Sequence, residues 1–397
     1  MYKNRYLNTI GVIVVSLLVV FFWIAYRENV TKNAHYYIGV ILAKTGKADF
    51  IGKPEAKVLE EIEKETNIFH FRKAAVGLII KDSGGNLEQA VKIFDSFSQD
   101  NNCLAVIGPS TSGESIPLAE TAEQRRIPLL SLAASNKIVT TESGAVRRWV
   151  FKFAQNDILA AERLANVIQN KKQYAVALIY SDDGFGKSGA AAFRSVIERG
   201  SPIRIVFERS YSSQQSQFQP MIDGLPSEVQ AVMIWGTAPG PALIVKALSL
   251  KQRKPQIYLS HGNASVDFIT STGPASEGAI IVGSRVLLDS KFLDKQLPED
   301  EAVLRYKEFW NMHEFGGTPS HFGGHAYDAI EALKVAMKDK EDCNRDIIRE
   351  RLEGLNNFTG VTGIFNFSPS DHAGLDVRAF ETYVIHSGAF ERMRTSE

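Results

Sequence analysis

Residues 107–115 read IGPSTSGES, and they join a short apolar run at 104–107 to an amphipathic pattern at 113–125. A strand that passes through a small-residue turn into a helix is the unit from which parallel sheets are built. Thr111 and Glu114 have the spacing of a capping box, so we expect the helix to begin there. The free N–H groups of its first turn predict a binding site for a carboxylate or phosphate. The alternative is that the serines and threonine only cap the helix, because capping residues would produce the same sequence.

The same alternation of strand and helix extends along the chain. Runs typical of strands lie at 36–42, 74–81, 104–107, 174–180, 203–208, 229–234, 257–259 and 279–282, with helical patterns between them at 53–65, 86–99, 113–125, 158–169, 186–199 and 240–250. Further helical patterns follow at 300–314, 322–338 and 345–353, before short strands near 363–367 and 379–385. This pattern predicts an α/β fold with two doubly wound parallel-sheet lobes, each covered by helices on both faces. A chain of 397 residues is also long for one core.

Composition excludes some classes of function. The 45 Lys and Arg residues equal the 45 Asp and Glu residues, so no overall positive field would recruit nucleic acid. The two cysteines, Cys103 and Cys343, form no CxxC pair, which excludes a thiolate zinc site and a redox motif. They are interpreted as free thiols, or as one disulfide if the chain is exported.

The N-terminus predicts export. Residues 7–26 contain no charged side chain, and as a helix they would be roughly 30 Å long, about the thickness of the bilayer's hydrocarbon core. Lys3 and Arg5 precede this stretch and favour a cytoplasmic N-terminus. A cleaved signal peptide is the alternative, but the stretch ends in FWIAY, where cleavage requires small residues. We therefore expect residues 1–35 to form an uncleaved membrane anchor and a linker.

Motifs for catalysis or cofactors are weak. The string SDDGFGKSG at 181–189 has GxGxxG spacing, but its two aspartates would repel the pyrophosphate of a dinucleotide. The string HFGGH at 321–325 lacks the glutamate of a zinc-protease motif, so we expect surface or core histidines there. There is no GxSxG and no P-loop. The sequence therefore predicts no enzymatic activity, no cofactor and no metal.

Eight strings occur in an order and spacing that resemble one known family. They are VIGPSTSGES, IPLLSLAAS, FKFAQND, IYSDDGFGKS, YLSHGNAS, GPASEG, HAYDAIEAL and FTGVTGIFNF. Together they resemble the periplasmic leucine/isoleucine/valine-binding family, the type I receptors that feed ABC transporters, over about residues 36–390. The resemblance implies two lobes that close like a clamp on a ligand, joined by segments that cross near 155–157, 283–285 and 360–362. Lobe one would comprise residues 36–156 plus 284–360, and lobe two 157–283 plus 361–397.

The resemblance also implies which residues meet the ligand. Ser112 stands where a family serine binds the ligand's carboxylate. Ala133 and Ser135 stand where a backbone carbonyl and a hydroxyl contact the ligand. Asp157 matches an acid at the lobe boundary, and Phe185 replaces a tyrosine that covers the ligand from lobe two.

Three positions depart from the family pattern. His261 stands where an acid pairs with the ligand's ammonium group, while Thr237 and Ile51 stand where tyrosines are found. A neutral imidazole cannot replace a carboxylate opposite a buried ammonium group, because the unpaired charge is costly. These departures predict a ligand with one carboxylate, an apolar or aromatic body, and a weakly held or absent amino group. A deaminated analogue would then lose less than about tenfold in affinity.

The function predicted from these observations is the extracytoplasmic substrate-binding component of an ABC transporter. It would capture a small carboxylate-bearing solute, an amino acid of the branched-chain or a related class, and deliver it to a membrane permease. A ligand-sensing receptor that works with a separate signalling partner is the alternative. An NAD-dependent or hydrolytic enzyme is the third hypothesis.

Overall fold

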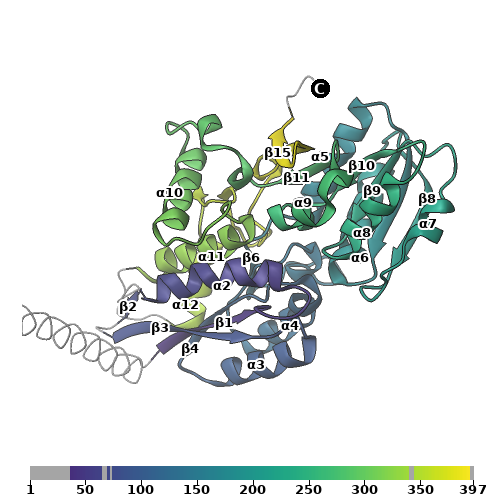
Figure 1. The fold of residues 1–397 in the computed structure, drawn as a ribbon. Coiled ribbons are helices and arrows are strands. Elements are labelled where there is room, and N and C mark those ends of the chain that lie inside the picture. Colours follow the sequence, from purple (N-terminus) through teal and green to yellow (C-terminus); the bar gives the residue numbers. More distant parts are fainter. Residues whose placement is uncertain (1–35, 65–68, 72–73, 339–343, 394–397) are drawn as a thin grey trace, which may run out of the picture.

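The computed structural model describes residues 36–64, 69–71, 74–338 and 344–393, arranged in two lobes (Figure 1). The first lobe is built on a six-stranded sheet whose strand order is β2-β3-β1-β4-β5-β6. Its strands are β1 (Tyr36–Leu42), β2 (Phe69–Phe71), β3 (Ala74–Asp82), β4 (Cys103–Ile107), β5 (Leu129–Ser131) and β6 (Val150–Lys152). Its helices are α2 (Asp49–Lys64), α3 (Leu87–Gln99), α4 (Ser112–Arg125), α10 (Pro298–Met312), α11 (His321–Met337) and α12 (Arg345–Glu353).

The second lobe is built on a seven-stranded sheet with the order β15-β14-β11-β10-β9-β7-β8. Its strands are β7 (Ala175–Ser181), β8 (Arg204–Tyr211), β9 (Ala231–Trp235), β10 (Gln256–Leu259), β11 (Ile280–Gly283), β14 (Glu381–His386) and β15 (Ala389–Arg392). Its helices are α5 (Asp157–Asn170), α6 (Gly184–Glu198), α7 (Gln219–Asp223), α8 (Gly240–Ser249) and α9 (Val266–Thr272).

The central strands of both sheets are buried on both faces, as the continuous apolar runs predict. In β1, Ile38, Val40 and Leu42 face one core of the first lobe, while Ile41 faces the other. In β7, Val176 and Ile179 likewise belong to opposite cores of the second lobe. Successive side chains of a strand point to opposite faces, so a strand covered by helices on both sides must be apolar throughout. The predicted doubly wound fold is therefore confirmed.

The sheets are not parallel throughout, which corrects one part of the prediction. The central pairs are parallel, with Ile38 of β1 beside Leu78 of β3. At the edges, β2 runs antiparallel to β3, β14 runs antiparallel to β11, and β15 runs antiparallel to β14. Mixed sheets of this kind commonly carry their antiparallel strands at the edge.

The first crossing between the lobes lies where the sequence places it, but the third does not. Phe153 belongs to the core of lobe one and Ala154 to that of lobe two, which agrees with a crossing near 155–157. The predicted third crossing at 360–362 is wrong, because Phe365 and Ala379 still pack in the core of lobe one. The chain enters lobe two only at Phe380.

A short hairpin explains this difference. Strands β12 (Phe358–Thr359) and β13 (Ile364–Phe365) pair antiparallel and turn the chain back into lobe one. The rings of Phe365 and Phe367 then pack on Phe153, with ring centroids 5.1 and 5.5 Å apart. Residues 361–379 are thus assigned to lobe one rather than to lobe two.

Two predictions about the chain concern residues that the structure covers only in part. Cys103 is a buried free thiol, whereas Cys343 lies outside the described residues. The predicted anchor at 7–26 also lies outside the described residues. Among the helices that are described, none has the length and apolar character needed to cross a bilayer.

Candidate functional site

Four helices begin at the junction of the two lobes. They are α4 and α11 of lobe one and α5 and α6 of lobe two, which start at Ser112, His321, Asp157 and Gly184. The residue before each helix caps it with a side-chain oxygen that accepts a backbone N–H: Thr111, Ser320, Asn156 and Asp183. Ligands of parallel α/β sheets bind beyond the carboxyl ends of the strands, where such helices start. The positive ends of these helix dipoles favour an anion.

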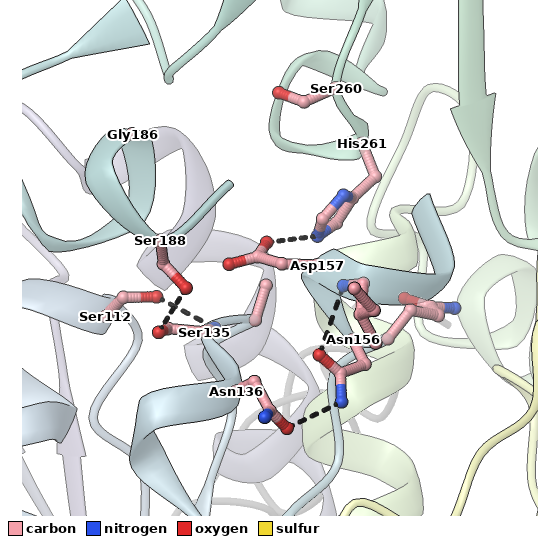
Figure 2. A network of polar contacts seen from close by, with 12 residues as sticks. Ser112, Ser135, Asn136, Asn156, Asp157, Gly186, Ser188, Ser260 and His261 are labelled. Atoms are coloured by element: carbon pink, nitrogen blue, oxygen red, sulfur yellow. Dashed lines mark hydrogen bonds and ion pairs between the residues drawn. The ribbon is translucent and has the colours of Figure 1, made fainter. Parts of the chain in front are cut away.

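A chain of serines spans the cleft between the lobes (Figure 2). Ser112 Oγ accepts a hydrogen bond from the backbone N–H of Ser135 at 3.2 Å. The hydroxyl of Ser135 donates to that of Ser188 at 2.6 Å. Ser112 and Ser135 belong to lobe one and Ser188 belongs to lobe two, and all three are buried. The structure therefore brings two of the predicted ligand contacts together, Ser112 and Ser135, and adds Ser188, which the sequence did not single out.

Asp157 and His261 form the second part of the site. The His261 Nε2 atom lies 4.0 Å from the Asp157 Oδ1 atom, and the two side chains point toward one another in Figure 2. Asp157 is 0% exposed and His261 is 2% exposed. Neither carboxylate oxygen and neither ring nitrogen has a hydrogen-bond partner among the described residues. Buried polar groups are nearly always hydrogen-bonded, so this pair has the character of a site that receives donors from a ligand.

Burial and the neighbouring Lys152 side chain together shift the pKa of Asp157. Burial raises the pKa of Asp157, while the nearby Lys152 ammonium group and the Ser188 hydroxyl lower this pKa. Burial in turn lowers the pKa of Lys152, and its Nζ atom donates to the carbonyl oxygen of Ala134 at 2.7 Å. Burial also lowers the pKa of His261 well below its ordinary value, which favours the neutral imidazole. The attraction between Lys152 and Asp157 thus opposes the effect of burial on the pKa of each group.

Aromatic side chains wall this pair. The rings of Phe185 and Phe380 meet His261 edge to face, with centroids 5.4 and 5.3 Å away. A methyl group added at Gly262 would come within 2.6 Å of the Phe185 ring and 3.1 Å of the Thr237 methyl group. Phe185 and Thr237, both predicted as ligand contacts, therefore lie beside His261.

The two remaining predicted contacts lie in lobe one. Ala133 is buried in the loop after β5, and its N–H donates to Ser131 Oγ at 3.2 Å. Ile51 is buried in the first turn of α2. The neighbouring Phe50 packs against Phe322, with ring centroids 5.9 Å apart. This contact ties the start of α2 to the start of α11.

Two buried histidines lie at the start of α11, and the sequence predicts no ligand-binding role for them. His321 and His325 are 1% and 2% exposed, so the alternative of core histidines is confirmed over surface ones. No cluster that could hold a metal occurs among the residues that the structure describes. His325 Nε2 lies 2.9 Å from the Gln155 side-chain oxygen, two residues before Asp157.

The lobes are in contact around this site, so the structure shows a closed clamp. Lys47 Nζ of lobe one donates to the carbonyl oxygen of Ser213 in lobe two at 3.1 Å. A Cβ atom added at Gly184 would lie 3.1 Å from the backbone nitrogen of Gly113. One added at Gly189 would lie 1.9 Å from the Trp235 ring. The glycines that resemble a dinucleotide fingerprint therefore allow close packing of α6 against lobe one and against β9.

Closure gives a testable consequence at Gly184. We expect Gly184→Ala to weaken ligand affinity by about threefold or more, because the added methyl group meets lobe one only when the clamp is shut. Gly113→Ala is the matched control, since its methyl group would meet nothing within 4 Å. Titration calorimetry measures both. Equal affinities in the two variants and the wild type would contradict this account of closure.

A large hollow of the described surface lies elsewhere. It has a volume of about 1290 Å³ and is lined by charged residues near the crossings, among them Arg163, Arg285 and Glu381. None of the predicted ligand contacts lines it. The candidate site therefore rests on converging, unpartnered polar groups inside a closed cleft.

This geometry defines a class of protein: a two-lobed clamp that holds a small polar ligand between α/β domains. A sequence profile described as periplasmic binding protein matches residues 35–380. The chain belongs to the periplasmic binding protein family. This is a family of solute-binding proteins, in agreement with the prediction that the chain is not an enzyme.

Similar proteins extend this finding. An amino acid binding protein of Pseudomonas aeruginosa is 20% identical over 264 residues, covering 66% of this chain and 67% of its own length. A Leu/Ile/Val-binding protein of Rhizobium johnstonii is 24% identical over 312 residues, covering 77% of this chain and 80% of its own. The sequence-based resemblance to the leucine/isoleucine/valine-binding family is thereby confirmed.

Solved structures share the fold. An extracellular ligand-binding receptor from Rhodopseudomonas palustris has a TM-score of 0.81 at 23% identity and covers 90% of this chain and 99% of its own. A leucine-binding protein from Thermotoga maritima has a TM-score of 0.76 at 19% identity, with coverage of 90% and 98%. At such low identities the likeness establishes the architecture alone.

Proposed function

We propose that this protein is the extracytoplasmic substrate-binding component of an ABC transporter and that it binds an α-amino acid in the inter-lobe cleft. The observation that carries the proposal is that hydrogen-bond donors for a carboxylate and an acceptor for an ammonium group lie together in one buried site. Hydroxyls and helix N-termini lie on one side, at Ser112, Ser135 and Ser188. An unpartnered carboxylate lies on the other, at Asp157.

The carboxylate of the ligand would bind at the serines. Because Ser112 Oγ accepts from the Ser135 N–H, the Ser112 hydroxyl proton is left to donate. The N-termini of α4 and α6 meet here, and both dipoles favour negative charge. Charge-assisted hydrogen bonds of this kind are about twice as strong as neutral ones.

The ammonium group of the ligand would bind at Asp157. The sequence predicts a weakly held amino group because His261 stands where the family has an acid that pairs with the ligand's ammonium group. Asp157 lies 4.0 Å from that imidazole, so a carboxylate stands beside the position where the family pattern requires one. In contrast to the expectation from the sequence, we therefore expect a deaminated analogue to lose more than tenfold in affinity. The names of the relatives, which refer to amino acids and to leucine, isoleucine and valine, support this class.

A thermal-shift panel tests the proposed function. Full-length protein in mild detergent is heated with each of the common L-amino acids, with their 2-oxo analogues, and with NAD. A ligand present at a hundredfold excess over its dissociation constant should stabilise the fold by about 2.7 kcal/mol. Stabilisation by at least one amino acid is expected. Stabilisation by NAD alone, or by 2-oxo acids as strongly as by their parent amino acids, would overturn the assignment.

We further propose that residues 1–35 anchor the protein in the membrane, with both lobes on the exported side. The support is the uncharged stretch at 7–26, preceded by Lys3 and Arg5. Full-length protein is expected to remain with membranes after carbonate washing, with its N-terminal peptide intact by mass spectrometry. A mature N-terminus beyond residue 25 in the soluble exported fraction would contradict the anchor. Delivery of the ligand to a membrane permease is part of the same proposal.

A further inference from the structure

Three histidines gather at the inner end of the cleft: His261 from the turn after β10, and His321 and His325 from the first turns of α11. All three are at most 2% exposed. Both ring nitrogens of His261 and His321, and the Nδ1 atom of His325, have no hydrogen-bond partner among the described residues. Polar atoms buried in this way are rare in native proteins and mark places where a bound group completes the hydrogen bonding.

The three imidazoles belong to one site rather than to separate pockets. The rings of His321 and His325 lie 5.2 Å apart. His325 Nε2 lies 2.9 Å from the Gln155 side-chain oxygen, and Gln155 is two residues before Asp157, which in turn faces His261 at 4.0 Å. The cluster is thus continuous with the proposed ammonium site.

Gln155 fixes the proton position on His325. The side-chain nitrogen of Gln155 donates to the Thr362 carbonyl oxygen at 3.2 Å, so its side-chain oxygen must be the atom that faces His325. The Nε2 atom of His325 therefore carries a proton and donates it. In a neutral ring the Nδ1 atom is then a bare acceptor, while His261 and His321 each offer one donor and one acceptor.

An aliphatic side chain cannot meet these requirements. A leucine, isoleucine or valine side chain would remove water from the imidazoles and leave up to five buried ring nitrogens unpaired. A side chain that carries oxygen, with or without an amide N–H, would pair with several of them. Sites built to hydrogen-bond a polar ligand reject the apolar analogue strongly, because the polar groups of the site are then left without partners.

We propose that the ligand is an amino acid whose side chain ends in a carboxyl or carboxamide group, and that this group hydrogen-bonds with His321 and its neighbours in the cluster. This inference rests on the proposed function, since it assumes an α-amino acid held by Ser112, Ser135 and Asp157. It departs from the aliphatic ligands named for the relatives.

The charges around the cluster decide how the two kinds of side chain would differ. Burial is the main cause that lowers the pKa of His261 and His325, and Lys152 of β6 lowers both further, so it places positive potential on the cluster. Asp157 of α5 is the acid that faces His261. A ligand carboxylate would be attracted to Lys152 and would favour a proton on one imidazole, whereas a carboxamide would bind the neutral rings. Binding of the acid would therefore be accompanied by proton uptake, and binding of the amide would not.

Ligands of matched shape test the proposal. Leucine, asparagine and aspartate share one branched outline, and calorimetric titration of the full-length protein in detergent compares them, with glutamine and glutamate as the longer pair. We expect the best polar ligand to bind at least tenfold more tightly than leucine. Repeating the titrations in buffers of different ionisation enthalpy separates the acid, with proton uptake, from the amide, without it.

The outcomes separate this inference from the proposed function. If leucine, isoleucine or valine binds more tightly than every polar amino acid, the inference is wrong while the proposed function stands. If no α-amino acid binds, both fail. A polar preference of tenfold or more supports both.

A pair of variants links the preference to the cluster. His321→Leu removes two unpartnered nitrogens and is expected to reduce the preference for the polar ligand over leucine at least tenfold. His321→Gln keeps a donor and an acceptor and should retain most of the preference. The melting temperature of unliganded His321→Leu should not fall, because a buried polar group without partners is replaced by an apolar one. A lower melting temperature with an unchanged ligand preference would assign His321 a structural role only.

Discussion

Replacing Asp157 with asparagine is expected to weaken the binding of an α-amino acid by about thirtyfold or more. Asp157 is fully buried, and its two carboxylate oxygens have no hydrogen-bond partner among the described residues. Removing one member of a buried charge pair at an interface costs about 2–5 kcal/mol, and 2 kcal/mol corresponds to about thirtyfold. Asparagine keeps the shape of the side chain, removes its charge and replaces one acceptor oxygen with an NH2 donor, so the loss reports the interaction with the ligand's ammonium group.

The matched control is Asp182→Asn. Asp182 lies one residue after β7 and is exposed, so this variant changes the net charge equally without touching the buried site. Calorimetric titration of the three proteins should show a loss for Asp157→Asn alone. The ratio of the affinities for an amino acid and for its 2-oxo analogue is the decisive quantity, because it does not depend on fold stability. If this ratio is the same in Asp157→Asn and the wild type, Asp157 does not hold the ammonium group.

Lys152 explains why fold stability is the weaker measurement here. Burial raises the pKa of Asp157 and lowers that of Lys152, and the attraction between the two groups opposes both shifts. Asparagine at position 157 would leave this cation with less compensation, and a buried charge without a partner is destabilising. A lower melting temperature of Asp157→Asn would therefore report on Lys152 as well as on the ligand site.

Periodicity allowed most of the fold to be predicted from the sequence. Strand β1 and helix α12 have the predicted bounds, and most other elements differ from them by a few residues. The exceptions are short. Strands β5 and β6 have three residues each, too few for a pattern of alternation to be recognised. The third crossing was misplaced because the turn of the β12–β13 hairpin depends on aromatic packing with Phe153, which connects distant parts of the chain.

The sequence predicted the serine half of the candidate site, but not how Asp157 and the histidines lie together in the other half. Ser112 and Ser135 follow strands and precede helical turns, and this local order marks a ligand loop in parallel sheets. The pairing of Asp157 with His261 joins two distant segments of lobe two, and neither residue reveals it in its own sequence context. The string HFGGH, which contains His321 and His325, does not match a metal-binding motif, so the sequence predicts no role in binding for these two residues. Their shared feature, burial without partners, appears only when α11 packs against the crossing segment.

Ser112→Ala is expected to lower the affinity for the ligand about ten- to a hundredfold. The Ser112 Oγ atom accepts from the Ser135 N–H, which leaves its proton to donate to the ligand's carboxylate at the start of α4. A hydrogen bond to a charged group contributes about 1.5–3 kcal/mol, which gives this range of affinity. The variant also leaves the Ser135 N–H without this acceptor, so part of any change belongs to the fold.

Ser115→Ala separates the two contributions. Ser115 lies one turn further along α4, is equally buried, and accepts a hydrogen bond from Ser131 at 2.9 Å while donating to the Pro109 carbonyl oxygen. Its loss should lower the melting temperature about as much as the loss of Ser112, but it should leave the affinity within about threefold of the wild type because Ser115 points into lobe one. Calorimetry and thermal melts of both variants decide the matter. Equal affinities of Ser112→Ala and Ser115→Ala would mean that the carboxylate binds elsewhere in the cleft and that the serines serve only to hold the lobes together.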